Sequence, residues 1–181
     1  MGKRVSWNEP GHLHELTFVT YHRKPILLLP GCPELFLEAL FAARASVPFD
    51  LYAYVLMPDH VHILLRPTKE GYEMAQVLSE IKLPAARLIV RHLAKTRPDV
   101  VKELYVERPD GKVVRQFWQR GGGYDRNMFE PTTVRNAIQY IHANPVRKGL
   151  CEATSDWPWS SAGAHEDFEE NGLIDTYDPH G

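Results

Sequence analysis

Two strand-like runs joined by only two residues constrain the fold of this 181-residue chain more than any other feature. Residues 49–57 read FDLYAYVLM and residues 60–66 read HVHILLR, and both runs are rich in β-branched, aromatic and leucine side chains. Pro58 and Asp59 between them favour a tight connection, so the two runs are predicted to pair as neighbouring antiparallel strands. The remaining segments must be arranged around this pair.

The segments on either side alternate between strand-like and helix-like patterns. The predicted elements are a strand at 15–22, a helix at 33–46, a helix at 73–96, a short strand at 116–119 and a last helix at 132–144. Pro84 is expected to kink or divide the second helix, and Pro145 and Gly149 to close the last one. The glycines at 121–123 are expected to form a mobile segment. The order β-α-β-β-α-β-α predicts an α+β fold, a ferredoxin-like antiparallel sheet with an additional C-terminal helix.

The composition favours a single folded domain. Apolar residues make up 44% of the chain and aromatic residues 10%, which argues against disorder. The predicted domain covers residues 1–163, and the acidic residues 164–181 are expected to form a flexible tail. No run approaches the roughly 20 apolar residues that span a bilayer, so a cytoplasmic protein without membrane contact is expected. The two cysteines are too few for a disulfide framework.

The net charge of −2 hides an uneven distribution. The acidic residues after position 164 offset a basic region between Lys82 and Lys148, which holds fourteen basic and six acidic residues. Such a region is compatible with a surface that binds phosphates. It is equally compatible with ordinary solvated helix faces.

His60 and His62 interrupt a run that would otherwise be apolar. Because side chains alternate along a strand, both imidazoles are predicted to lie on one face, opposite Val61, Ile63 and Leu65. The pair could be two satisfied or partly exposed histidines, or it could bind a common ligand. A metal ion would need a third ligand, from the protein or from a substrate.

The last predicted helix carries a second polar pattern. Asn136, Tyr140 and Asn144 are spaced four residues apart, so they lie on one face beside an apolar stripe. Tyr140 could pack its ring and expose its hydroxyl, and Asn144 could end the helix ahead of Pro145. Alternatively, the three side chains could belong to a site.

Three separated motifs resemble those of one family, in the same order. LMPDHVHILLRP resembles the His-hydrophobic-His signature of the single-tyrosine HUH endonucleases. QYIHANPVRKGL, followed by DWPWSS, resembles the C-terminal half of the REP-associated tyrosine transposases. The similarity extends from the ELTFVTYHR strand to Ser161 and implies the same ferredoxin-like fold.

The resemblance also implies roles for individual residues. His60 and His62 would be metal ligands, Tyr140 the nucleophile and Asn144 the third ligand, with Mg²⁺ or Mn²⁺ as the metal. Asp59 would be a turn residue or a residue that supports a ligand. The implied activity is cleavage and strand transfer of single-stranded DNA that carries palindromic hairpins, through a 5′-phosphotyrosine intermediate and a free 3′-OH. The REP-associated branch is expected to act as a monomer, with a homodimer as the alternative.

DNA contacts are predicted on basic and aromatic side chains. The candidate basic residues are Lys82, Arg87, Arg91, Arg115, Arg120 and Arg126. Trp118 could stack on a base or belong to the core, and Tyr124 is a second candidate nucleophile. Two other functions remain open, namely a non-catalytic binder of palindromic DNA and a small hydrolase that activates water.

Overall fold

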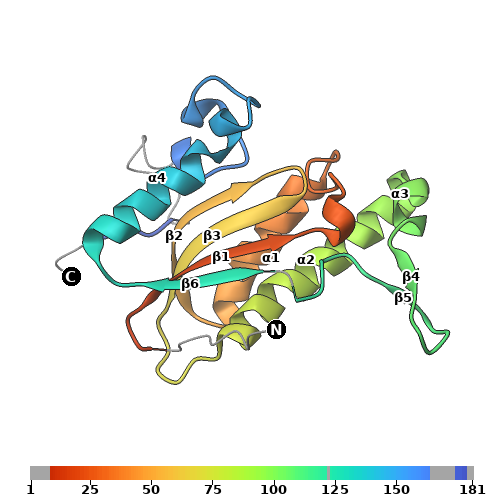
Figure 1. Cartoon of the computed structure of the whole chain (residues 1–181), viewed down its shortest axis with the longest axis horizontal. Helices are drawn as coiled ribbons and strands as arrows, with labels where there is room; N and C mark the ends of the chain where they lie inside the picture. Colours follow the sequence, from red (N-terminus) through yellow and green to blue (C-terminus); the bar gives the residue numbers. More distant parts are fainter. Residues whose placement is uncertain (1–8, 122, 164–173, 179–181) are drawn as a thin grey trace.

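The computed structural model describes residues 9–121, 123–163 and 174–178 (Figure 1). Its elements, in chain order, are β1 (Leu13–Val19), α1 (Cys32–Ser46), β2 (Phe49–Leu56), β3 (His60–Pro67), α2 (Met74–Thr96), α3 (Pro98–Lys102), β4 (Tyr105–Glu107), β5 (Val113–Arg115), β6 (Tyr124–Met128) and α4 (Pro131–Arg147). Short 3₁₀ turns occur at Tyr21–Arg23 and Thr154–Asp156. None of the helices in these residues is long and apolar enough to cross a membrane.

The main sheet has the order β2-β3-β1-β6, and all its pairs are antiparallel. This arrangement confirms the predicted ferredoxin-like sheet with its additional C-terminal helix. The β2–β3 connection is the tight turn at Pro58 and Asp59 that the sequence predicts. The β4–β5 hairpin is a separate two-stranded sheet inserted before β6.

The position of the fourth strand was predicted wrongly. Residues 116–119 contribute only a single bridge, between Trp118 and Thr20, and Trp118 instead packs its ring against Phe18 and Phe36 in the core. The actual strand is YDRNM, whose polar residues conceal it because it lies at the edge of the sheet with one face partly exposed.

Gly121 and Gly123, just before β6, occupy positions that disfavour a side chain. Gly121 has a left-handed backbone (φ +59), which favours glycine in a turn. A Cβ on Gly123 would lie 3.1 Å from the Thr17 carbonyl oxygen, so the absence of a side chain there lets the chain approach β1 closely. These two glycines bring the chain into register as β6.

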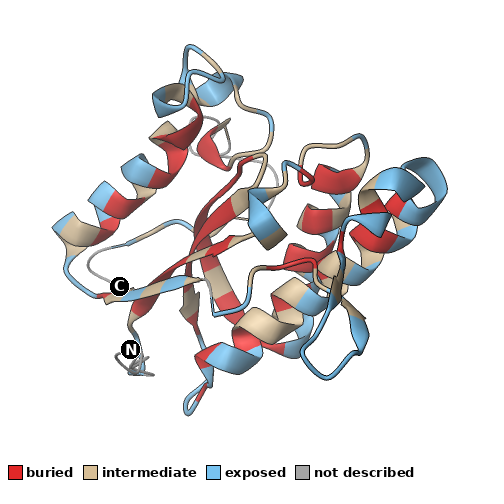
Figure 2. Cartoon of the chain, turned by 45° about the vertical axis from the view of Figure 1, so that its right-hand side comes forward, coloured by how far each residue is buried: buried red, intermediate tan, exposed pale blue. Residues whose placement is uncertain are grey.

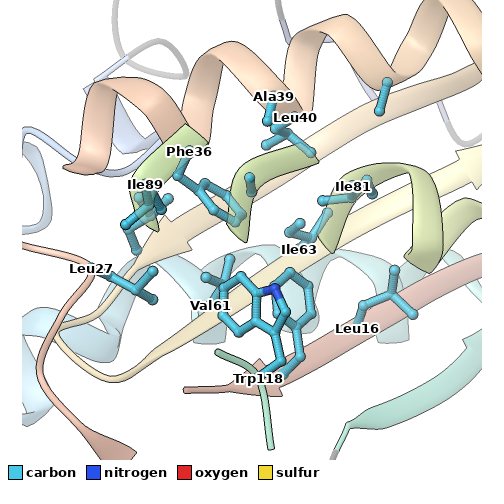
Figure 3. Close-up of a cluster of buried hydrophobic side chains, with 14 of the residues drawn as sticks. Leu16, Leu27, Phe36, Ala39, Leu40, Val61, Ile63, Ile81, Ile89 and Trp118 are labelled. Atoms are coloured by element: carbon cyan, nitrogen blue, oxygen red, sulfur yellow. The ribbon is translucent and has the colours of Figure 1, made fainter. Parts of the chain in front are cut away.

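Helices α1 and α2 cover one face of the sheet, as the close-up in Figure 3 shows. Val61 and Ile63 of β3 pack there against Phe36 and Leu40 of α1 and Ile81 of α2. All five side chains are fully buried, and burying each contributes roughly 1.5–3 kcal/mol. The alternation predicted for β3 therefore places its β-branched side chains on the face that α1 and α2 cover.

Pro84 does not divide its helix, and Pro145 does not close the last one. Helix α2 is continuous from Met74 to Thr96 with Pro84 inside it, so the helix is not divided. Pro84 lies on a half-exposed turn, where water can bind the Glu80 carbonyl that has lost its helical N–H partner. Helix α4 likewise continues through Pro145 to Arg147, and it ends two residues before Gly149, whose left-handed backbone (φ +67) favours glycine.

Helix α4 lies on the other face of the sheet, so the sheet is seen between α4 and the α1–α2 pair in Figure 2. Val134, Ala137 and Ile141 of α4 pack mainly against β2 and β3, on side chains that include Val55 and Leu64. The half of this face formed by β1 and β6 is covered much less. This less covered half borders His60 and His62 on β3.

The predicted acidic tail falls largely outside the described residues. Of the part that is described, Asp175 accepts hydrogen bonds from Arg44 Nη2 (2.8 Å) and from the Leu51 backbone N–H (2.7 Å), and Tyr177 packs edge-on against Tyr52. Residues 174–178 therefore lie against β2. The domain boundary at 163 stays a prediction.

Candidate active site

His60 and His62 lie side by side on the α4 face of β3, as the alternation predicts. Their ring centroids are 5.0 Å apart with the rings nearly perpendicular, and His62 is 7% exposed. The intervening Val61 points into the helix-covered core. The two imidazoles therefore share a half-buried surface at the start of β3, one of the two central strands of the sheet.

Each imidazole is held through its Nδ1 atom. His60 Nδ1 lies 2.6 Å from a carboxylate oxygen of Asp59, whose other oxygen accepts from Arg23 Nη1 at 2.9 Å. His62 Nδ1 lies 2.8 Å from Thr17 Oγ1, on the neighbouring strand β1. These contacts fix the ring orientations and direct both Nε2 atoms away from the partners already bound.

The electrostatics favour a neutral His62 and an ionised Asp59. Burial, and then the neighbouring His60, lower the pKa of His62 to about 4. Burial raises the pKa of Asp59, but the hydrogen bonds from His60 and Arg23 outweigh this effect, and the net pKa lies below its ordinary value. A neutral imidazole with an oriented Nδ1–H is the form that binds metal ions.

Tyr140 reaches this surface from α4. Its ring meets the His62 ring edge-on, with the centroids 5.9 Å apart at 90°, and its side chain is 42% exposed. The guanidinium carbon of Arg147, seven residues later on the same helix face, lies 4.9 Å from the centre of the Tyr140 ring. The phenol is thus accessible, oriented and next to a positive charge.

Asn144 is buried one turn after Tyr140. Its Nδ2 donates to the carbonyls of Tyr140 (2.8 Å) and Ile141 (3.4 Å). Pro145 has no N–H to offer the Ile141 carbonyl, so the Asn144 amide partly replaces the missing helical hydrogen bond. The residue therefore sits inside the helix and does not end it.

The donor set limits how a metal ion could be bound. Within the described ranges, no three His, Cys, Asp or Glu side chains come close enough to hold a metal ion. Asn144, whose amide α4 brings to this side of the sheet, is a candidate third protein ligand beside His60 and His62.

The six candidate DNA-binding residues divide between the two faces. One groove of about 530 Å³ lies between α2 and residues 115–121, on the side of α1 and α2. It is lined by four of the six candidates, namely Lys82, Arg87, Arg115 and Arg120. Arg91 lies one turn beyond Arg87 on α2 and is exposed, but it does not line the groove. Arg126 is on β6, with Nη1 3.8 Å from Glu15 on the α4 face.

Trp118 belongs to the core and is not a surface platform for a base. It is 8% exposed, and its Nε1 donates to the Lys82 carbonyl at 2.8 Å. The Lys82 ammonium lies 5.9 Å from the centre of the Trp118 ring and 5.3 Å from that of Phe18, and burial lowers the pKa of Lys82. Trp118 thus shapes the groove from beneath.

Sequence reasoning missed two residues of the site. Arg147 could have been found, because its spacing of seven from Tyr140 places both on one helix face. Thr17 could not, because its role depends on β1 lying beside β3, and nothing in a β-branched strand residue marks it as a partner of His62.

The depressed pKa of His62 predicts a pH-dependent stability. Between pH 6.5 and about 4 the unfolded chain binds a proton at His62 that the folded chain does not, so stability falls as pH falls through this window. Between pH 6.5 and 5 this loss is at most about 2 kcal/mol. Urea unfolding in EDTA at pH 7 and pH 5 should show a smaller loss for His62→Gln than for the wild type. Equal losses would contradict the prediction.

Known proteins resemble this chain in both sequence and fold. A protein of Haemophilus influenzae, assigned as a REP-associated tyrosine transposase, is 29% identical over 151 residues, which cover 83% of this chain and 80% of the relative. The REP-associated tyrosine transposase of Escherichia coli K12 is 24% identical over 124 residues, covering 68% and 61%. The structure of a REP-associated tyrosine transposase bound to a REP hairpin superposes with a TM-score of 0.71 at 17% identity, covering 100% of this chain and 94% of that one, which shows a common fold.

The family is established by a match over most of the chain. The model of the IS200-like transposases matches residues 11–144, a range that contains His60, His62, Tyr140 and Asn144. The resemblance read from the three sequence motifs is thereby confirmed. This chain belongs to the IS200-like transposase family and is homologous to the REP-associated tyrosine transposases.

Proposed function

We propose that the chain cleaves and rejoins single-stranded DNA beside palindromic hairpins, with Tyr140 as the nucleophile. The observation that carries this proposal is the placement of an exposed phenol edge-on against His62, on the face where His60 also lies. Family membership supports the reaction class, and the hairpin named for the structural relative supports the substrate.

The proposed reaction is a transesterification. The phenol of Tyr140 loses its proton, its Oη forms a bond to phosphorus, the bond from phosphorus to the 3′ oxygen breaks, and the departing 3′ oxygen is protonated. The products are a 5′-phosphotyrosine and a free 3′-OH. Because the phosphodiester energy is conserved in the covalent link, a 3′-OH can attack it and reseal or transfer the strand without ATP. Arg147 places a positive charge beside the ring, close to where the phosphate must lie.

We assign His60, His62 and Asn144 as the ligands of a divalent metal ion, and the residues fit such an ion. In the tautomers protonated at Nδ1, His60 donates to Asp59 and His62 donates to Thr17, and both keep their Nε2 lone pairs. The Asn144 NH₂ group faces helix carbonyls, which leaves its amide oxygen for a ligand. A bound Mg²⁺ or Mn²⁺ would polarise the scissile phosphate and offset its developing charge. Two imidazoles favour Mn²⁺ over Mg²⁺.

The test of this proposal is a covalent-adduct assay. The protein is incubated with Mn²⁺ or Mg²⁺ and end-labelled single-stranded DNA that carries palindromes from the region flanking its own gene. An SDS-resistant protein–DNA adduct that maps to Tyr140 by peptide sequencing is expected, with an equal amount of free 3′-OH product. Binding without an adduct, across several palindromes and both metal ions, would instead support a non-catalytic DNA-binding protein.

We propose further that the groove lined by Lys82, Arg87, Arg115 and Arg120 holds phosphates of the hairpin. Four cations around a concave surface match a nucleic-acid backbone, and Gly121 of the groove lies three residues before the edge strand β6 begins. A single copy of the chain contains both surfaces, which is consistent with action as a monomer.

The groove proposal predicts a change in salt dependence. The Arg115→Ala/Arg120→Ala double variant is expected to bind the hairpin more weakly and to reduce the slope of log K against log salt by about 0.9 for each duplex phosphate that it no longer neutralises. Binding is measured by fluorescence anisotropy from about 50 to 300 mM salt. Arg108→Ala, exposed in the β4–β5 turn outside the groove, serves as the matched control. An unchanged slope in the double variant would remove the groove from the binding surface.

A further inference from the structure

The half of the sheet that α4 leaves open carries an exposed aromatic ring. Tyr124 of β6 is 47% exposed, and among the described residues no aromatic or hydrogen-bonding partner is found for its side chain. The alternation of side chains along β6 determines on which face of the sheet Tyr124 lies. Met128 packs in the α4-side core, whereas Asp125 points the other way and bonds His14. Tyr124 and Arg126 therefore lie on the same side of the sheet as His60 and His62.

The register places Tyr124 in line with the site. His62 of β3 is paired with Thr17 of β1, and Thr17 is paired with Tyr124 of β6. The three residues form one row across the sheet, and Thr17 is the residue that holds His62 through its hydroxyl. With neighbouring strands about 4.8 Å apart, the backbones of His62 and Tyr124 are about 10 Å apart. This distance separates Tyr124 from His62, which Tyr140 contacts directly, and so argues against Tyr124 as the nucleophile.

A basic side chain, Arg126, lies near the Tyr124 ring on the same face. The Arg126 side chain is 50% exposed and lies two residues further along β6 on the same face, next to the carboxylate of Glu15. On the other side of Tyr124, Arg120 and Gly121 line the basic groove three to four residues earlier in the chain. The edge strand β6 thus connects the groove on one face with the candidate active site on the other.

We propose that Tyr124 is a stacking platform for a base in the single-stranded segment that runs from the hairpin to the scissile phosphate, with Arg126 beside it as a phosphate contact. This inference rests on the proposed function. Single-stranded nucleic acid is bound by aromatic rings that stack on bases and by cations that follow the backbone, and both are present on this face. At a rise of about 3.4 Å per nucleotide in a stacked strand, the stacked base lies within about three nucleotides of the cleaved bond.

The test couples a protein change to a DNA change. Tyr124→Val removes the ring and keeps strand propensity, whereas Tyr124→Phe and Tyr124→Trp keep a ring. Each protein is assayed for binding and cleavage on a hairpin substrate and on substrates with a single abasic nucleotide at each flanking position. Tyr124→Val is expected to weaken binding of the intact substrate about tenfold or more, with the Phe and Trp variants close to the wild type.

The result that distinguishes base stacking from a structural role is the coupling between Tyr124→Val and one abasic position. At one position within about three nucleotides of the cleavage site, the abasic substitution should weaken wild-type binding about as much as Tyr124→Val does, and should have no further effect on that variant. A merely structural role of Tyr124 would not single out one nucleotide. Losses that multiply at every position, or a Tyr124→Val variant that binds like the wild type, would overturn the proposal. Neither result would affect the adduct at Tyr140, so this inference and the proposed function fail separately.

Discussion

Replacement of Tyr140 by phenylalanine is expected to lower DNA cleavage by roughly three orders of magnitude or more, because the variant has no oxygen to attack phosphorus. The structure should tolerate the change. The ring keeps its contacts with His62 and Arg147, and within the described part of the chain no hydrogen bond of the Tyr140 hydroxyl is found. Hairpin binding should therefore change by less than about twofold. Single-turnover cleavage and anisotropy on the same substrate measure the two quantities.

The control for this variant is Tyr105→Phe, which removes a hydroxyl from a tyrosine of similar exposure on the β4–β5 hairpin. It should cleave like the wild type. If Tyr140→Phe still cleaves and leaves no covalent adduct, water is the nucleophile, and the chain is a metal-dependent hydrolase. If the adduct persists in Tyr140→Phe and maps to Tyr124, the roles assigned to the two tyrosines are reversed.

Replacement of His62 by alanine is expected to have the second largest effect, a loss of cleavage of at least about 100-fold that added Mn²⁺ only partly restores. The variant lacks one of the three proposed ligands. Thr17→Val, which keeps the shape of the side chain and removes its hydroxyl, should cost about 10- to 100-fold in metal affinity or activity, because His62 Nδ1 loses its orienting partner. The measurement is the initial cleavage rate as a function of Mn²⁺ concentration.

The two variants should differ in a specific way. In Thr17→Val the half-maximal Mn²⁺ concentration rises while the rate at saturation is largely retained, whereas in His62→Ala the saturated rate itself falls. His22→Asn is the control, because His22 is exposed, its ring is not one of the groups that hold His60 or His62, and its left-handed backbone (φ 52) is one that asparagine tolerates. Wild-type metal dependence in His62→Ala would remove His62 from the ligand set.

Local sequence patterns correctly predicted on which face of its strand or helix each candidate site residue lies. The period of two along β3 puts His60 and His62 together and Val61 in the core, because a strand has no other way to present them. The spacing of four along α4 puts Tyr140 and Asn144 one turn apart. The order of the elements was also sufficient for the fold, because the tight turn after β2 leaves few ways to pair the remaining strands.

Failures of sequence reasoning occurred where a residue's environment overrides its propensity. QFWQ has the composition of a strand, but Trp118 is more stable in the core between Phe18 and Phe36. YDRNM has the composition of a loop, but it completes the sheet because one face of an edge strand can be polar. Pro145 resembles a helix terminator, but Asn144 partly replaces the hydrogen bond that it removes.

The sequence by itself determined which side chains share a face within one strand or one helix, since backbone geometry repeats over a few residues. Only the tertiary structure decided which faces meet. Packing of Val134, Ala137 and Ile141 against β2 and β3 brings Tyr140 onto His62, across nearly eighty positions of the chain. Pairing of β1 with β3 supplies Thr17 to the imidazole. These contacts are non-local, and their stability comes from burial of apolar surface that is distributed over the whole core, so no short motif can encode them.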